Sequence, residues 1–368
     1  MRNVRAALLA GGRGERMGRL TDHVCKPLLP YGGVCRLVDF SVANVVRSGI
    51  PEIVVLSRYR EGELIKHLFR SWDGSSGLRL NLGPHDALIR EQVSVSGGAA
   101  QFVLPARPEE LGTADALLAS AEWVFAPGAT DVLLLHADHA YVSDYRHMVR
   151  EHREAGADVT IGVQRIERRF VPLFGMVEVN RDGTVCQLVE KPSEPTSDLV
   201  FTAFCLFRRA VLEEVLTALA RLPASEWQHD ISRDVLPFII DHGYRVRAFT
   251  VRTYWADIGT VERYYLGHLH LLRSPAALPL LDMPRTLPGS GPMQIGPGQV
   301  MSSDPQRRKS RIKEAVLYPG CVVEPAAVIE RSIVLPGARV CEGAQVRDTV
   351  IVENETVTGV REGLAGLA

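Results

Sequence analysis

The chain has 368 residues, of which 46% are hydrophobic and 23% are charged, a globular composition with room for more than one domain. The formal net charge is −1, so the charge balance favours neither nucleic acid nor a membrane surface as a partner. No apolar run approaches the roughly 18 residues of a membrane-spanning helix, and the six cysteines show no CxxC spacing, so we expect a cytoplasmic protein with reduced thiols.

Strand-like and helix-like segments alternate through the first two-thirds of the chain. In order, we predict Val4–Leu9 (strand), Arg36–Ser48 (helix), Ile53–Leu56 (strand), Glu61–Arg70 (helix), Thr113–Phe125 (helix), Asp131–His136 (strand), Tyr145–Ala155 (helix) and Asp158–Val163 (strand). Strands come closer together between Asp158 and Val251, which suggests inserted hairpins. This order predicts an α/β domain with a Rossmann-like mixed, mainly parallel sheet.

A glycine-rich turn follows the first predicted strand. The segment LLAGGRGERMG (residues 8–18) places Gly11, Gly12 and Gly14 where backbone N–H groups can approach a phosphate closely. The turn lacks both the Gly-Lys-Ser/Thr ending of a P-loop and the third glycine of a dinucleotide fingerprint. Arg16 and Lys26 follow, and two cations so close to the turn favour a polyphosphate ligand.

The composition changes near residue 274, where a stretch rich in Pro, Gly and Ser begins. We read 1–273 as the catalytic domain, 274–311 as a linker and 312–368 as a repeat domain. Seven valines in the repeat domain lie six residues apart, which is typical of hexapeptide repeats in a parallel β-helix of about two coils. They are Val316, Val322, Val328, Val334, Val340, Val346 and Val352.

Motifs along nearly the whole chain resemble those of the sugar-1-phosphate nucleotidylyltransferases, especially the bacterial glucose-1-phosphate adenylyltransferase family. The motifs are LAGGxGxRM followed by KP, GTADA (Gly112–Ala116), ADHAY (Ala137–Tyr141), FGMVEV (Phe174–Val179), VEKP (Val189–Pro192) and YWADIGT (Tyr254–Thr260). The repeat tail is similar to the second domain of that family. The resemblance implies a nucleotidyltransferase fold with a short C-terminal left-handed parallel β-helix.

The resemblance also implies a reaction and a set of site residues. A phosphate oxygen of a sugar 1-phosphate attacks the α-phosphorus of a nucleoside triphosphate, and charge neutralisation is the main catalytic task. Arg16, Lys26 and Asp138 would be catalytic, and Asp138 and Asp257 would bind Mg²⁺. The implied nucleotide-binding residues are Leu9, Gly11, Gly12, Gly14, Arg58, Gly112, Thr113 and Asp115, and the implied substrate-binding residues are Gly175, Glu190, Lys191, Phe201, Asp230 and Trp255.

Departures from the family pattern lie at positions that would choose the substrates. Phe201, Cys205 and Ile231 stand where the glycogen enzymes carry serine, tyrosine and phenylalanine, so we expect a pocket for a ring less polar than glucose. On the base side, Arg58 and Arg107 replace amides, and arginine suits the O6 and N7 acceptors of guanine.

Segments such as Asp198–Phe207 and Trp227–Val235 resemble the guanylyltransferase branch of the family that acts on valienol 1-phosphate. We therefore expect Mg²⁺-dependent transfer of a nucleoside monophosphate, with GMP favoured, from GTP or ATP to a sugar or cyclitol 1-phosphate in aminocyclitol antibiotic biosynthesis. We expect a homo-oligomer, either a dimer or a tetramer. A glucose-1-phosphate adenylyltransferase and a non-catalytic paralogue that binds nucleotide sugars are the alternatives, and the sequence leaves the nucleobase open.

Overall fold

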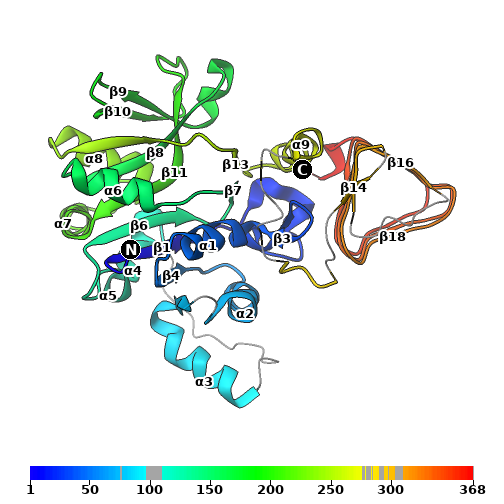
Figure 1. Ribbon diagram of the computed structural model, residues 1–368, viewed down its shortest axis with the longest axis horizontal. Coiled ribbons are helices and arrows are strands. Elements are labelled where there is room, and N and C mark those ends of the chain that lie inside the picture. The colour runs from blue at the N-terminus through cyan, green and yellow to red at the C-terminus, as the bar shows by residue number, and fades with distance from the viewer. Residues whose placement is uncertain are drawn as a thin grey trace. The chain divides into compact units, whose positions relative to one another are not determined.

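The computed structural model describes residues 1–74, 77–96, 110–275, 278, 283, 285–289, 294–296, 298–302 and 310–367 (Figure 1). The chain forms two compact units. Unit 1 consists of Met1–Gly11, Asn44–His136 and Ser143–Arg252, and unit 2 of Gly12–Ala43, Ala137–Val142 and Thr253–Ala368. Among the described residues, no helix is both long and apolar enough to cross a membrane.

Unit 1 is built on a 9-stranded mixed sheet in which β8 and β12 extend from β11, beside the path β10-β9-β11-β6-β1-β4-β5. The strands are β1 (Val4–Leu9), β4 (Glu52–Leu56), β5 (Arg79–Asn81), β6 (Asp131–His136), β8 (Val159–Arg165), β9 (Gly175–Val179), β10 (Val185–Glu190), β11 (Leu199–Arg208) and β12 (Val246–Thr250). β6, β1, β4 and β5 are parallel, whereas β11 is antiparallel to its three neighbours. The predicted mixed sheet and its antiparallel β9–β10 pair are confirmed.

The helices of unit 1 present apolar residues on one face. In α7, Val211, Leu212, Val215, Leu216 and Leu219 are buried, which is the spacing of one helical stripe. The segment predicted as one helix over Thr113–Phe125 is instead two helices, because Ser120 leaves the helical region at φ −112° and ψ 17°. The helices are α2 (Glu61–Trp72), α3 (Asp86–Ser96), α4 (Thr113–Ala119), α5 (Ala121–Val124), α6 (Arg146–Glu154), α7 (Arg209–Leu219) and α8 (Leu236–Asp241), and α1 (Leu37–Arg47) contains residues of both units.

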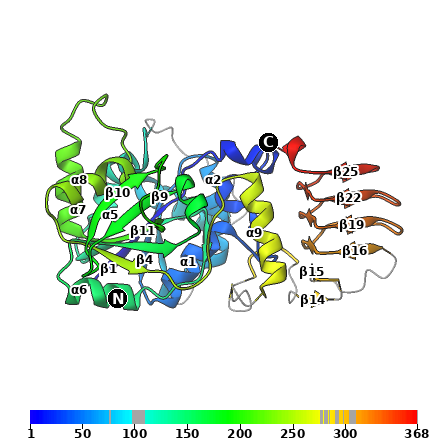
Figure 2. The ribbon, with the colours of Figure 1, turned by 90° about the horizontal axis from the view of Figure 1, so that it is seen from above.

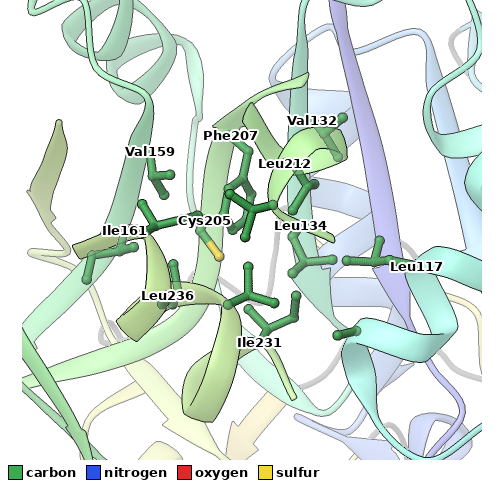
Figure 3. Packing of buried hydrophobic residues seen from close by; sticks show 14 of the residues in the cluster. Leu117, Val132, Leu134, Val159, Ile161, Cys205, Phe207, Leu212, Ile231 and Leu236 are labelled. Carbon is green, nitrogen blue, oxygen red and sulfur yellow. The ribbon is translucent and has the colours of Figure 1, made fainter. Parts of the chain in front are cut away.

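The core of unit 1 lies between the sheet and helices α4, α7 and α8 (Figure 3). Cys205 of β11 is 1% exposed and Ile231 is 2% exposed, and both belong to this core cluster. Burial raises the pKa of the Cys205 thiol, which keeps it neutral. The expectation that Cys205 and Ile231 line a substrate pocket is therefore wrong, because packing within the core accounts for their apolar character.

The first part of unit 2 carries the motif loops. It contains η1 (Glu15–Thr21), η2 (Lys26–Leu28), the hairpin of β2 (Pro30–Tyr31) and β3 (Cys35–Arg36), and the antiparallel pair of β7 (His139–Tyr141) and β13 (Trp255–Asp257). Helix α9 (Val261–Arg273) follows β13 and begins at Thr260, whose side chain accepts a hydrogen bond from the Arg263 N–H at 3.2 Å.

The rest of unit 2 is a parallel β-helix with a triangular outline, and Figure 2 shows its strands stacked in successive coils. The first face contains β14 (Gln294–Gly296), which pairs antiparallel with its neighbour, and the parallel strands β15 (Val300–Ser302), β17 (Ala315–Leu317), β20 (Ile333–Val334) and β23 (Val350–Ile351). The second contains β16 (Arg311–Lys313), β19 (Val328–Glu330), β22 (Gln345–Arg347) and β25 (Val360–Glu362), and the third β18 (Val322–Val323), β21 (Arg339–Val340) and β24 (Thr356–Val357).

The coil length explains two differences from the expected repeat. Val316 pairs with Ile333 and Val322 with Arg339, so a coil here takes 17 residues rather than three hexads. Valines that recur every six residues therefore do not all point the same way along the β-helix. Val322 is 40% exposed, whereas Val334 lies in the inner cluster. The expected two coils are too few, because each strand of a face belongs to a different coil and the second face has four strands. The segment read as a linker also contributes two strands, β14 and β15.

Candidate active site

Parallel pairing brings two motif loops to the same edge of the sheet in unit 1. β1 and β6 run side by side with Leu9 opposite His136. The glycine turn continues from β1 and the ADHAY motif from β6. In parallel α/β sheets, ligands bind outside the carboxyl ends of the strands, so both motifs start where that rule expects a ligand.

Lys26 and Asp138 form an ion pair within unit 2. The Lys26 ammonium nitrogen lies 2.5 Å from Asp138 Oδ2, and the Lys26 side chain is 8% exposed against 29% for Asp138. Gly14 supports this arrangement: its φ is +74°, and a Cβ there would lie 2.9 Å from the Cβ of Lys26. Gly14 therefore allows the turn to pack directly on the lysine.

His139 and Trp255 support Asp138 from the neighbouring strand pair. The indole N–H of Trp255 donates to His139 Nδ1 at 3.0 Å, which places the proton of a neutral imidazole on Nε2. His139 Nε2 then lies 3.4 Å from Asp138 Oδ1. Trp255 thus acts on Asp138 through His139. His139 is absent from the predicted site, although its place in the ADHAY motif offered a signal.

Asp257 lies on the strand next to Asp138. β13 pairs with β7 so that Asp257 stands opposite His139, and the Ile258 N–H donates to the Asp138 carbonyl at 3.2 Å. The Asp257 carboxylate is bound by Arg263, another residue that the sequence reading missed. A Cβ at Gly259 would approach both Asp257 Oδ1 (3.1 Å) and Arg263 Nη1 (3.2 Å), so the missing side chain leaves room for this pair.

The donor set around Asp138 fits a divalent cation. His136, Asp138 and His139 offer ligand atoms within 4.8 Å of one another, the one such His, Cys, Asp and Glu group in the described part of the chain. Asp257 adds a carboxylate from the adjacent strand. Carboxylate oxygens suit Mg²⁺, which prefers hard ligands and keeps several waters. Lys26 forms an ion pair with Asp138, and Arg263 forms one with Asp257.

The remaining glycine-turn residues differ in their surroundings. Arg16 and Gly12 are exposed, with Arg16 at the start of η1. No atom lies within 4 Å of a Cβ placed on Gly12. Leu9, at the end of β1, is 9% exposed, and Gly11 follows with its Cβ position 3.7 Å from Arg58. An exposed arginine beside open backbone can meet a phosphate without displacing packed side chains.

In unit 1, the GTADA loop is tied to the segment before α8. A Cβ on Gly112 would lie 2.3 Å from the His229 carbonyl oxygen, and that oxygen accepts the Ala114 N–H at 2.8 Å. The Asp115 carboxylate lies 2.6 Å from His229 Nδ1. The φ of Gly112 is −175°, which any residue can adopt. Glycine is therefore required at this position by the close approach of two backbone segments and not by its own backbone conformation.

Thr113 and Asp230 complete this junction. Thr113 Oγ1 donates to Asp230 at 3.1 Å and accepts the Ile231 N–H at 2.9 Å. Asp230 also caps the π-helical turn at Ile231–Val235 by accepting the N–H groups of Ser232 and Arg233. The carboxylates of Asp115 and Asp230 therefore hold loops together, and their predicted contacts with ligand stay predictions. His229, which the sequence reading did not select, is the centre of the junction.

Arg58 follows β4 and is paired with Glu110. Its Nη1 lies 3.9 Å from Glu110 Oε1, and the two side chains are 27% and 19% exposed. Arg107, the other arginine expected to read the base, lies outside the described residues.

The sugar-side residues lie on and beside β9, β10 and β11. Gly175 faces Glu190, because a Cβ there would lie 3.1 Å from Glu190 Oε2. Lys191 has a φ of +50° and places its ammonium 3.4 Å from the Glu190 carboxylate. Phe201 is 8% exposed, in the core cluster beside Gly175. These strands thus bring together the carboxylate of Glu190, the ammonium of Lys191 and the aromatic ring of Phe201.

Comparison with known proteins finds matches for both the N-terminal α/β region and the C-terminal repeat region. Residues 5–274 match the family model for nucleotidyl transferase, and residues 297–362 match a GlmU-like C-terminal hexapeptide model. Over 332 residues, the chain is 48% identical to the valienol-1-phosphate guanylyltransferase of Streptomyces hygroscopicus subsp. limoneus, covering 87% of each chain.

Glucose-1-phosphate adenylyltransferases are more distant relatives. That of Thermomicrobium roseum is 35% identical over 284 residues (77% of this chain, 63% of the relative). That of Bacillus cereus is 32% identical over 327 residues (87% and 79%). The family resemblance predicted from the motifs is confirmed, and the chain belongs to the nucleotidyl transferase family of enzymes.

Proposed function

We propose that the protein transfers GMP from GTP to the phosphate of valienol 1-phosphate and releases pyrophosphate. The observation that carries this proposal is the 48% identity with a valienol-1-phosphate guanylyltransferase over 87% of both chains. The Lys26–Asp138 pair and the adjacent Asp257 supply the charges that the reaction needs. The relatives that act on glucose 1-phosphate are only 32–35% identical.

In the proposed reaction, an oxygen of the acceptor phosphate attacks the α-phosphorus, and the bond to the β-phosphate oxygen breaks. The acceptor oxygen is already ionised at neutral pH, so no general base is required. Negative charge builds up on the oxygens of the transferred phosphoryl group and of the leaving pyrophosphate. Catalysis therefore consists of positioning these groups and neutralising their charge. Lys26 would neutralise charge near the α-phosphate, and the exposed Arg16 would hold the leaving pyrophosphate.

Mg²⁺ would be held by Asp138 and Asp257 and would supply charge neutralisation and orientation of the phosphates when bound. Lys26 would also offer donors to the substrate phosphates, since an ammonium carries three donors and its ion pair with Asp138 does not use all of them. The Trp255–His139 hydrogen bond keeps Asp138 oriented. Gly11, Gly12 and Gly14 would offer backbone N–H groups to the triphosphate.

The acceptor would be held by the strands β9–β11. Lys191 would pair with its phosphate and Glu190 would accept a hydrogen bond from a ring hydroxyl. Valienol has a carbocyclic, unsaturated ring, and Phe201 beside Gly175 offers it an apolar edge. Phe201 belongs to the same core cluster as Cys205 and Ile231, but its Cβ lies 3.6 Å from the Cβ position of Gly175, beside Glu190, whereas Cys205 and Ile231 are only 1% and 2% exposed.

A matrix of GTP and ATP against valienol 1-phosphate and glucose 1-phosphate tests the proposal, with pyrophosphate release as the readout. We expect the highest kcat/KM for GTP with valienol 1-phosphate. Glucose 1-phosphate with ATP as the best pair would contradict it and favour ADP-glucose synthesis.

We also propose the domain boundaries 1–273, 274–311 and 312–368, with the first strands of the repeat domain, β14 and β15, contributed by the segment 274–311. We further propose a homo-oligomeric, cytoplasmic enzyme of aminocyclitol antibiotic biosynthesis. The 48% identity with a valienol-1-phosphate guanylyltransferase supports the last point. Sedimentation of the full chain would measure the oligomeric state.

A further inference from the structure

Gly267 lies inside helix α9, where alanine would stabilise the helix better. It belongs to the run Val261–Arg273, and glycine loses more backbone freedom than alanine when a helix forms. A Cβ at position 267 would lie 2.3 Å from the hydroxyl oxygen of Tyr31, far closer than an ordinary Cβ contact. Alanine therefore has no room at this position as long as the Tyr31 hydroxyl keeps its place.

Tyr31 is held in that place by its surroundings, because it is completely buried. Its ring centroid lies 4.6 Å from that of His268, 5.9 Å from that of Phe40 and 6.1 Å from that of Tyr264. Burial raises the pKa of Tyr31 well above its ordinary value, so the phenol keeps its proton. Its hydroxyl shares a 3.0 Å hydrogen bond with the hydroxyl of Tyr254, which fixes the end of the side chain.

The hydrogen bond between Tyr31 and Tyr254 joins two segments of unit 2 that carry site residues. Tyr31 lies in β2, which follows the η2 segment that begins with Lys26. Tyr254 directly precedes β13, the strand that ends with Asp257. β13 also pairs with β7, which begins one residue after Asp138. The bond therefore links the segment of the cation to the strand pair of both carboxylates.

We propose that Tyr31 is a positioning residue of the reaction, which uses its hydrogen bond with Tyr254 to hold Lys26 in place relative to β13. Gly267 leaves room for the hydroxyl that makes this bond. A misplacement of about 1 Å can cost on the order of 100-fold in rate, so a bond remote from the reacting atoms can affect turnover. The inference rests on the proposed function, because it takes Lys26 and Asp257 to act on the nucleotide.

Steady-state kinetics and urea unfolding of the full-length protein test this inference. The variants are Tyr31→Phe, Gly267→Ala, the double variant and, as a matched control, Tyr265→Phe. Tyr265 is a tyrosine of α9 whose hydroxyl donates to the Arg331 carbonyl at 2.8 Å, so its removal costs a comparable hydrogen bond that leads away from the site. Pyrophosphate release is measured with the fastest pair among GTP or ATP and valienol or glucose 1-phosphate.

Tyr31→Phe should lower kcat by about 3- to 10-fold, less than the roughly 10- to 100-fold for a group that contacts a metal ligand directly. The nucleotide KM should stay within about twofold, because the charge that Lys26 neutralises develops in the transition state. Gly267→Ala should lower kcat at least as much, since the added Cβ displaces the Tyr31 hydroxyl. Once that hydroxyl is absent, as in the double variant, Gly267→Ala should lower kcat no further and should destabilise the protein less. Tyr265→Phe should lower stability and leave kcat unchanged.

An unchanged kcat in Tyr31→Phe would overturn the inference, and so would an equal loss of kcat in Tyr265→Phe. If Gly267→Ala lowers kcat by the same factor with and without the Tyr31 hydroxyl, the glycine does not act through Tyr31 and the inference fails. Glucose 1-phosphate with ATP as the fastest pair, together with the expected loss in Tyr31→Phe, would refute the proposed substrates and support the inference. The two failures are therefore distinguishable, and a protein inactive with every pair would overturn both proposals.

Discussion

Replacing Gly112 by alanine tests whether the junction between the GTADA loop and His229 holds unit 1 together. The added Cβ would lie 2.3 Å from the His229 carbonyl oxygen and 2.9 Å from its carbonyl carbon, and both are backbone atoms that cannot rotate away. Since contacts under 3.0 Å are essentially never seen for Cβ, the two segments must separate by roughly 1 Å.

The magnitude follows from the hydrogen bonds that cross the junction. Separation breaks the 2.8 Å bond from the Ala114 N–H to the His229 carbonyl and strains the 2.6 Å His229–Asp115 contact. A buried donor left without its partner costs about 1–3 kcal/mol. Alanine restricts the unfolded chain and returns about 0.4–1 kcal/mol. The loss dominates, and we expect a net destabilisation of about 1–2 kcal/mol.

Urea unfolding monitored by tryptophan fluorescence measures this free energy, with nucleotide KM as a second readout. Gly11→Ala is the control within the same unit, because its Cβ would meet Arg58 and the Leu56 carbonyl at ordinary distances of 3.7 and 3.9 Å. If Gly112→Ala is destabilised no more than Gly11→Ala, and its nucleotide KM is unchanged, the close approach does not hold the loop and the reasoning fails.

Three further predictions concern unit 2. Asp138→Asn should stay folded but lose about 100-fold or more in Mg²⁺-dependent pyrophosphate release, as losses of metal-site residues do; activity within tenfold of wild type would remove Asp138 from the metal site. A Met1–Arg311 fragment should lose solubility, because Tyr265 and His268 of α9 bond to Arg331 and Tyr318 of the β-helix; a soluble, active fragment of unchanged oligomeric state would contradict this. Burial lowers the pKa of His268 to about 4, so this histidine stays neutral in the folded protein and gains a proton on unfolding between pH 6.5 and 4. Acidification should therefore remove up to about 3 kcal/mol of stability, and His268→Gln, compared by urea unfolding at pH 7 and pH 4.5, should show a smaller loss.

The parts of the fold that follow from periodicity were predictable. The alternation of strands and helices predicts a mainly parallel sheet, and the confirmed pairing of β1 with β4 and β6 follows from it. The break at Ser120 was not predictable, since serine is tolerated in helices and nothing in Thr113–Phe125 marks a stop. The β-helix was predicted, but its coil length was not. The valines recur every six residues, whereas paired positions of successive coils lie 17 residues apart at Val316–Ile333 and 15 apart at Gln345–Val360.

For the candidate site, the motifs located the charged residues but not their partners. Lys26 and Asp138 are 112 positions apart in the chain, and neither motif alone says that they form a pair. His139, His229 and Arg263 were missed for a common reason: each acts by holding an acidic residue of a motif, and that function depends on a tertiary contact.

Cys205 and Ile231 show how an apolar substitution can be misread from sequence. Both replace polar or aromatic residues of the glycogen enzymes, and a smaller or drier substrate is one explanation. Their position in the core beside Leu236 and Phe207 gives another, because a side chain facing a packed helix must be apolar whatever the ligand is (Figure 3). The two explanations differ in where the changed side chain points. Substrate choice on the acceptor side is therefore better sought at polar side chains outside this core, such as Glu190 and Lys191, which are 22% and 46% exposed.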